Sequence, residues 1–176
     1  TDPKSSFFLG QHPLRLTLKK GKEKAVRQRH HWIYSGAVAS LPSFTDGDIA
    51  EVFSSTGEKL GLAMLNQGRS ILGHMVAFGE ETLEEALLHR IREAAHLRSR
   101  WFDPKKTDAI RLINAEGDGI PGLIVDAYRD VLVMQVANPG MERIKEQITA
   151  PEAPSTQNQD YQKHTRGTHV EPTVLL

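Results

Sequence analysis

The chain has 176 residues, which suits one domain or two small ones, and its 22 Lys and Arg balance 22 Asp and Glu, so the net charge is zero. It contains no cysteine, which excludes disulfides, thiolate metal sites and a cysteine nucleophile from these residues. No apolar run reaches the roughly 18 residues that a membrane span needs, and no signal-peptide pattern opens the chain. We therefore expect a cytoplasmic protein without a membrane partner.

The first part of the chain carries most of the excess positive charge. Residues 1–13 contain Pro3, Gly10 and Pro13 and predict an irregular lead-in, and the period-two alternation of Leu14–Leu18 predicts a half-buried strand. Residues 1–34 hold eight Lys or Arg against two acidic residues, a local charge of +6 that the rest of the chain balances. This asymmetry indicates either a polyanion partner or a solvated charged face.

An aromatic cluster follows the basic segment. Trp32 and Tyr34 lie within His30–Gly36, where they could stack on bases or pack in the core or its rim. The adjacent pair His30 and His31 lacks a directed third ligand, so we predict no metal site.

Residues 46–78 show the pattern of a β-meander. Strands are predicted over Asp48–Phe53, Leu60–Leu65 and Ser70–Phe78, with turns between them. Several short strands at regular spacing are typical of a small barrel.

Glu80–Phe102 predicts one long helix. Thr82 and Glu85 form a capping-box pattern at its start, and Arg98 and Arg100 complement the macrodipole at its end. Trp101 and Phe102 are expected to anchor the end of the helix, and its Glu and Arg side chains are expected to be solvated. The predicted apolar face consists of Leu83, Leu87, Ile91, Ala94 and Ala95.

The segment from Arg111 to Gln135 predicts a second meander. Its strands are expected at 110–113, 123–125 and 131–136, with turns over Glu116–Gly122 and Asp126–Asp130. An amphipathic helix is predicted over Gly140–Ile148. Residues 149–176 predict an irregular tail that lies extended against its own domain or a neighbouring copy, with Val174–Leu176 as its apolar anchor.

Gly117, Gly119 and Gly122 spell G-x-G-x-x-G, the fingerprint of dinucleotide-binding loops. That motif requires a helix that opens at the third glycine. Here Gly122 precedes a strand-forming Leu-Ile-Val run, and Pro121 lacks an amide donor. We therefore predict a structural turn between two strands.

Two stretches resemble a known family. Leu14–Val38 resembles the start of the PUA domain in class I SAM-dependent rRNA methyltransferases that methylate cytosine at C5, and Ala109–Lys145 resembles the domain that follows it in that family. The family usually reads Gly-His-Pro-Trp where this chain has Arg29-His30-His31-Trp32. The resemblance extends from about Leu14 to Ile148, and residues 149–176 do not share it.

This resemblance implies an α+β fold. A β-rich PUA-like pseudo-barrel is expected at residues 14–79, followed at 80–148 by a small α+β domain with one long helix and a three-stranded meander. The family's SAM-binding domain and catalytic cysteine are expected to be absent from this chain. SAM would then belong only to an intact family member, and this chain alone would be inactive, with no cofactor and no catalytic residue of its own.

The implied partner is RNA, ribosomal RNA in particular. Glu116, Asp118 and Asp126 are interpreted as turn-forming side chains that bond local amides. The alternative function is a protein-interaction or homodimerisation module, which salt-independent association would distinguish from RNA binding. The RNA-contact candidates are Lys19, Lys20, Lys22, Lys24, Arg27, Arg29 and His30 for phosphates and Trp32 for stacking.

Overall fold

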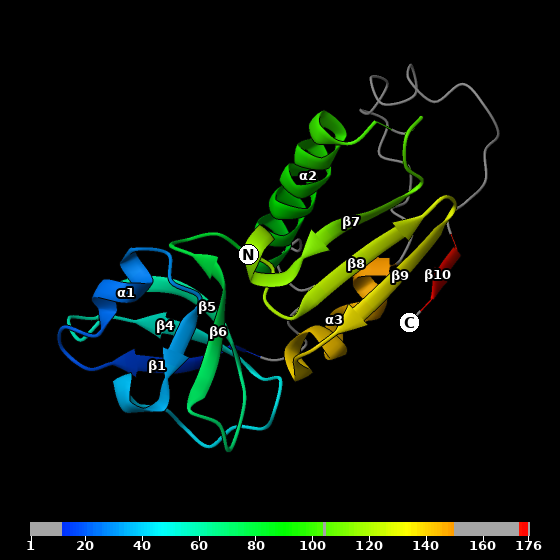
Figure 1. Ribbon diagram of the computed structural model, residues 1–176. Coiled ribbons are helices and arrows are strands. Elements are labelled where there is room, and N and C mark those ends of the chain that lie inside the picture. The colour runs from blue at the N-terminus through cyan, green and yellow to red at the C-terminus, as the bar shows by residue number, and fades with distance from the viewer. Residues whose placement is uncertain (1–11, 104, 150–172, 176) are drawn as a thin grey trace.

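A computed structural model describes residues 12–103, 105–149 and 173–175 of the chain. Two β-sheets lie side by side, and a long helix stands beside the second of them (Figure 1). The predicted α+β class, with a curled PUA-like sheet and a second, smaller sheet with helices, is confirmed.

The N-terminal sheet has six strands in the order β2-β6-β5-β4-β1-β3. Strands β1 and β4 run parallel, with Leu14 opposite Ala50, and the other neighbours are antiparallel. The elements of this part are β1 (Leu14–Leu18), α1 (Glu23–Arg27), β2 (Trp32–Tyr34), the 3₁₀ turn η2 (Ser35–Ala37), β3 (Val38–Ser40), β4 (Ile49–Phe53), β5 (Lys59–Leu65) and β6 (Ile71–Phe78).

Helix α2 (Leu83–Trp101) begins at the capping box that the sequence predicts. Thr82 Oγ1 accepts the Glu85 N–H at 3.2 Å, and Glu85 Oε2 accepts the Thr82 N–H at 3.0 Å. This exchange satisfies two amide groups that a helix start otherwise leaves without partners.

The second sheet contains the predicted meander and one further strand, in the order β10-β9-β8-β7. Strand β10 pairs in parallel with β9, which makes the sheet four-stranded instead of three-stranded. Thr173–Leu175 of the expected irregular tail therefore form a strand against their own domain. The elements are β7 (Ala109–Asn114), the 3₁₀ turn η3 (Ala115–Asp118), β8 (Leu123–Tyr128), β9 (Val131–Val136), α3 (Pro139–Thr149) and β10 (Thr173–Leu175).

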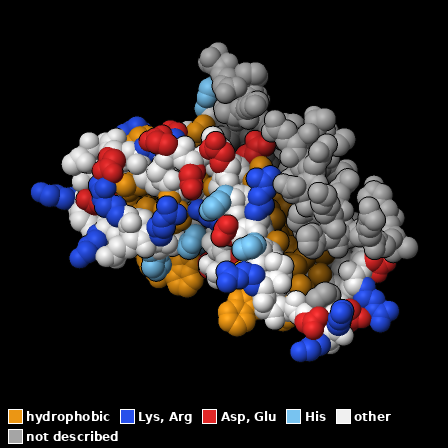
Figure 2. Space-filling view, turned by 90° about the horizontal axis from the view of Figure 1, so that it is seen from above, with side chains coloured by type: hydrophobic (Ala, Val, Ile, Leu, Met, Phe, Trp, Pro, Cys, Tyr) orange, Lys and Arg blue, Asp and Glu red, His pale blue; other side chains and the backbone are white. Residues whose placement is uncertain are grey.

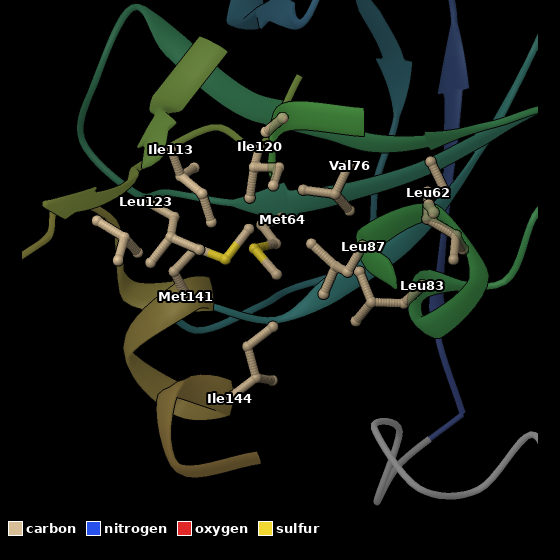
Figure 3. Close-up of a cluster of buried hydrophobic side chains, with 14 of the residues drawn as sticks. Leu62, Met64, Val76, Leu83, Leu87, Ile113, Ile120, Leu123, Met141 and Ile144 are labelled. Carbon is tan, nitrogen blue, oxygen red and sulfur yellow. The ribbon is translucent and has the colours of Figure 1, made fainter. Parts of the chain in front are cut away.

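One hydrophobic core joins the two sheets. Met64 and Val76 on the outer face of the N-terminal sheet pack with Leu87 of α2, Leu123 of β8 and Met141 of α3 (Figure 3). All five side chains are at least 97% buried. A second cluster fills the interior of the curled sheet, with Leu16, Ile33, Val52, Leu65 and Met75 among its members.

Strands β5 and β6 are buried on both faces. Met64 faces the shared core while Leu65 faces the interior of the curled sheet, as the two-residue period of a strand requires. The same alternation places Val76 in one core and Met75 in the other. The N-terminal sheet therefore supplies one wall of the core on which the second sheet rests.

Several sequence expectations are wrong. The five-residue helix α1 was not predicted, and β8 continues to Tyr128, so the turn before β9 is shorter than Asp126–Asp130. Ala95 is exposed, outside the apolar face of α2. Trp101 and Phe102 do not anchor the end of α2, since they are 78% and 45% exposed.

Residues 1–11, 150–172 and 176 lie outside the described residues, so most of the expected lead-in and tail is not characterised structurally. Pro13 and His12 have no regular secondary structure, and Thr149 closes α3 instead of starting the tail.

Candidate nucleic-acid interface

Helix α1 and the turn before it present lysines to solvent, and Val26 is the buried side chain of the helix. Val26 packs into the interior of the curled sheet and fixes the helix there. Lys20, Lys22 and Lys24 are exposed and make no hydrogen bond or ion pair among the described residues. Their charges are available to a ligand.

Two of the predicted contact residues have partners within the protein. Arg27 forms a bidentate ion pair with Glu58, at 2.7 Å and 2.5 Å, and this pairing raises the pKa of Arg27. Lys19 Nζ donates to the Gly36 carbonyl at 2.9 Å. The charge of Arg27 is therefore compensated, which the sequence did not indicate because the two partners are 31 residues apart.

Arg29, His30 and Trp32 come together where α1 ends. Arg29 has a φ of 61°, a left-handed conformation that turns the chain out of the helix toward β2. His30 Nδ1 accepts the Trp32 N–H at 3.1 Å, and the two rings meet edge to face with centroids 5.7 Å apart. These three residues line a depression of about 460 Å³ together with Gln28 and Glu116.

The aromatic residues of β2 remain partly open to solvent. Alternation along the strand buries Ile33 and leaves Trp32 38% and Tyr34 47% exposed. Figure 2 shows histidine side chains gathered with Lys, Arg and acidic side chains across the middle of one face of the molecule. A face that combines cations with accessible aromatic rings can take both phosphates and bases.

Two further histidines lie at or near this site, His31 in the lining of the depression and His74 on β6 beside Glu116. His31 Nδ1 is 2.9 Å from the Met75 carbonyl oxygen, and because that oxygen only accepts, the ring donates from Nδ1. His74 Nδ1 is 3.9 Å from Glu116 Oε1. Burial lowers the pKa of both rings, against the opposing influence of the Met75 carbonyl on His31 and of Glu116 on His74. Both rings are therefore neutral near pH 7.

Arg90 connects helix α2 to this region. Its guanidinium donates to the Val76 carbonyl and lies 5.7 Å from the centroid of the Phe78 ring, which Arg29 approaches at 5.3 Å. The Arg90 side chain is only 11% exposed, and burial lowers its pKa. The expectation that the arginines of α2 are solvated is wrong here, because the helix lies against β6.

The glycine turn positions Glu116 at the edge of the site. Gly117–Gly122 connects β7 to β8, and β8 begins directly after Gly122, so no helix opens there and the predicted structural turn is confirmed. Asp118 accepts the Asn114 N–H at 2.6 Å and is the turn-forming side chain expected. Asp126 instead binds Arg111 across the strands, and Glu116 bonds no local amide among the described residues.

Sequence reasoning missed His31, His74, Arg90 and Glu116 as parts of this site. They come from β6, α2 and η3 and the segment before β2, and no spacing along the chain relates them.

Within the described ranges, no three His, Asp or Glu side chains are grouped as metal ligands would be. None of the helices described is long and apolar enough to cross a membrane.

The curled sheet with its short helix belongs to a recognised class of domain. Residues 16–78 match the family model described as a PUA-like domain. The chain is also homologous to proteins named ribosomal RNA large subunit methyltransferase I. It is 35% identical over 134 residues to the one from Alteromonas mediterranea and 30% identical over 140 residues to one from Yersinia pestis.

These alignments include 74% and 78% of this chain but only 34% and 35% of the relatives, so the chain spans about a third of the length of the curated relatives that it matches. Among solved structures, a proposed SAM-dependent methyltransferase from Streptococcus mutans matches with a TM-score of 0.65 and 21% identity, over 77% of this chain and 36% of that one. A proposed methyltransferase in complex with SAH matches with a TM-score of 0.66 and 21% identity, over 77% and 35%. Both show the same fold over the matched part.

Proposed function

We propose that this chain is the RNA-binding portion of an rRNA methyltransferase-like protein, and that the face formed by α1 and β2 holds the RNA. The observation that supports this most directly is the convergence of Arg29, His30 and Trp32 on one depression, close to the exposed lysines of α1 and of the turn before it. The PUA-like match over the same residues and the homology to rRNA methyltransferases add support.

The chemistry of the face fits a structured RNA. Lysines are point charges that contact phosphates with little dependence on base sequence, and an accessible indole can stack on an unpaired base beside a stem. Lys20, Lys22, Lys24 and Arg29 are the proposed phosphate contacts. Arg27 is left out because Glu58 already pairs with it.

The proposed target is ribosomal RNA of the large subunit, as the names of the relatives indicate, and by resemblance the modified atom is C5 of a cytosine. That chemistry needs a thiolate and SAM. The sequence has no cysteine, so the nucleophile would come from outside these residues. We therefore propose that these residues hold the RNA and neither bind SAM nor transfer the methyl group.

Salt dependence of RNA binding tests the proposal. With about four phosphate contacts, log K should fall with log salt with a slope of roughly −3 to −4, from about 0.7–0.9 per contact. In the variant Lys20→Glu/Lys22→Glu/Lys24→Glu, we expect weaker binding to all structured RNAs and a slope shallower by about 2 to 3 units. Binding to a large-subunit rRNA fragment is measured by fluorescence anisotropy between low and moderate salt.

The matched control reverses three exposed cations elsewhere, Arg92→Glu/Arg100→Glu/Lys106→Glu, which changes the net charge equally and should leave the slope near that of the parent protein. Equal binding by the parent protein and the lysine triple variant at low salt would contradict the proposal. Salt-independent self-association, without RNA binding, would favour the homodimerisation module instead.

A further inference from the structure

A second cavity shares Glu116 with the depression at α1. Its volume is about 740 Å³, within the range of small-molecule clefts, roughly 300–1,000 Å³. The loop between β5 and β6 and strand β6 contribute Asn66, Arg69 and His74 to one wall. Glu116 of η3 and Asn138 before α3 come from the second sheet's side.

Two buried polar atoms belong to residues that line this cavity, and they have no hydrogen-bond partner within the part of the chain that the structure describes. They are Asn66 Oδ1 and His74 Nδ1. Asn66 is 6% exposed, and its backbone N–H donates to the Leu72 carbonyl at 2.8 Å, so the loop is held while the side-chain oxygen is not used. A buried acceptor without a donor is costly in a folded protein, and such atoms call for an explanation.

The other buried amide in the cavity wall has a structural role, which sets Asn66 apart. Asn138 Nδ2 donates to the Pro121 carbonyl at 2.8 Å, and Asn138 Oδ1 accepts the Met141 N–H at 2.8 Å. Gly122, with a φ of 78°, makes room for it, since a Cβ there would lie 2.2 Å from Asn138 Nδ2. Both ends of the Asn138 amide are therefore bonded within the protein.

We propose that this cavity holds one unpaired nucleobase of the bound RNA, a base that carries an exocyclic amino group. The inference rests on the proposed RNA-binding function and names a subsite within it. The unused groups are acceptors, Asn66 Oδ1 and the Glu116 carboxylate, so the ligand must supply N–H donors. The amino group of guanine, adenine or cytosine offers two N–H donors for these two acceptors, whereas uracil offers only its single N3–H.

The surroundings of these acceptors fit a base better than a free phosphate. Ile71 and Ile124 give the cavity apolar walls for the faces of a ring, and Arg69 can take the attached phosphate. The Glu116 carboxylate would repel a phosphate placed at the acceptors themselves. Burial lowers the pKa of His74, so that ring adds no positive charge near pH 7.

The path of the RNA is consistent with this subsite. Trp32 and His74 are paired residues of β2 and β6, so their side chains project from the same face of the sheet. Glu116 lines both the α1 depression and this cavity. An RNA strand that contacts α1 and passes Trp32 would therefore lie close to the cavity.

The test uses RNA hairpins that differ only in one bulged nucleotide, G, A, C or U, with a fully paired stem as reference. We expect the parent protein to bind the G-, A- and C-bulged stems about tenfold more tightly than the U-bulged and paired stems, as one or two satisfied buried acceptors would give. In Asn66→Leu, which removes the acceptor at similar volume, this preference should disappear while binding to the paired stem is kept.

Glu116→Gln is a second variant in case Asn66→Leu does not fold, because the Glu116 side chain is 40% exposed. It should also reduce the preference for bases with an amino group. Glu93→Gln, an exposed change on α2, is its matched control and should keep the preference. Salt-dependent binding with equal affinity for all five stems would overturn the subsite and leave the proposed function standing. Failure to bind any stem at low salt would overturn both.

Discussion

At the scale of single residues, charged side chains from distant parts of the chain are paired in places where the sequence predicts solvent. Arg98 holds Asp118 with two hydrogen bonds of 2.7 Å, and its Nε donates to the Arg111 carbonyl at 3.1 Å. The two side chains are only 13% and 9% exposed. This pair fixes the glycine turn against α2, which in turn places Glu116 at the proposed interface.

We expect Asp118→Ala to lower the free energy of unfolding by about 3 kcal/mol, because it leaves the Arg98 guanidinium buried without its partner and the Asn114 N–H without its acceptor. The measurement is urea unfolding followed by circular dichroism. The matched control is Asp108→Ala, which breaks the solvent-exposed pair with Arg129 and should have a much smaller effect on the free energy of unfolding. Equal losses in the two variants would contradict the assigned difference in burial.

At the scale of elements, α2 connects the two halves of the molecule. Its first turns pack Leu83 and Leu87 into the shared core, and its later turns carry Arg90 and Arg98 toward β6 and the glycine turn. A helix in this position must begin at a fixed residue, because a shift of one residue would rotate its apolar face by about 100°. The capping box at Thr82 supplies that fixed start.

Thr82→Ala should therefore destabilise the protein by about 1 kcal/mol, the usual cost of losing a helix N-cap. The change is measured as a shift in the midpoint of urea unfolding. Ser99→Ala is the control in the same helix, since that exposed hydroxyl only donates to the His96 carbonyl, and we expect little or no loss. A Thr82 variant as stable as the parent would show that packing alone fixes the start of α2.

At the scale of the whole molecule, the two sheets share a core, and His31 and His74 lie where the sheets meet. Around them are Arg90, Glu116, His30 and Arg69, of which only Glu116 favours their protonated forms. Burial dominates and lowers the pKa of both rings on folding. The unfolded chain therefore binds more protons than the folded protein as the pH falls through about 6.5.

The two neutral histidines therefore make their full contribution to the free energy of unfolding above the pKa of histidine in the unfolded chain. This contribution is lost as the pH falls below that pKa. We expect the free energy of unfolding to decline from about pH 7 toward pH 5.5. In the double variant His31→Gln/His74→Gln this decline should be smaller, whereas His89→Gln on the exposed surface of α2 should keep it. Unfolding curves at half-unit pH steps provide the measurement.

The carboxylates affect the free energy of unfolding at lower pH than the histidines, so they do not interfere with the measurement between pH 7 and 5.5. The pKa of Asp48 is lowered, mainly by the Thr45 N–H and then by Arg143, so its contribution is lost only below about pH 4. A free energy of unfolding that stays constant from pH 7 to 5.5 would contradict the buried placement of the two rings.

Local patterns and the family resemblance were enough to predict most of the elements and the class of fold. Period-two alternation located β1, and short strands at regular spacing with turns between them located β4, β5 and β6. The Thr82–Glu85 pattern located the start of α2. These signals depend on neighbours along the chain. Pro121 and the apolar run after Gly122 were enough to reject a phosphate loop. The resemblance of the two quoted stretches gave the PUA-like class and the homology to rRNA methyltransferases, both of which the comparisons support.

Which side chains meet depends on how the elements pack in three dimensions. Helix α1 is too short to show a helical period, and the partners of Arg27 and Arg98 are 31 and 20 residues away. The exposure of Trp101 and the burial of Arg90 depend on where α2 lies against β6 and β7. The cavity at Asn66 and Glu116 forms where the two sheets pack on a common core. The strands of each sheet can be predicted from the sequence, but no local pattern predicts how the sheets pack.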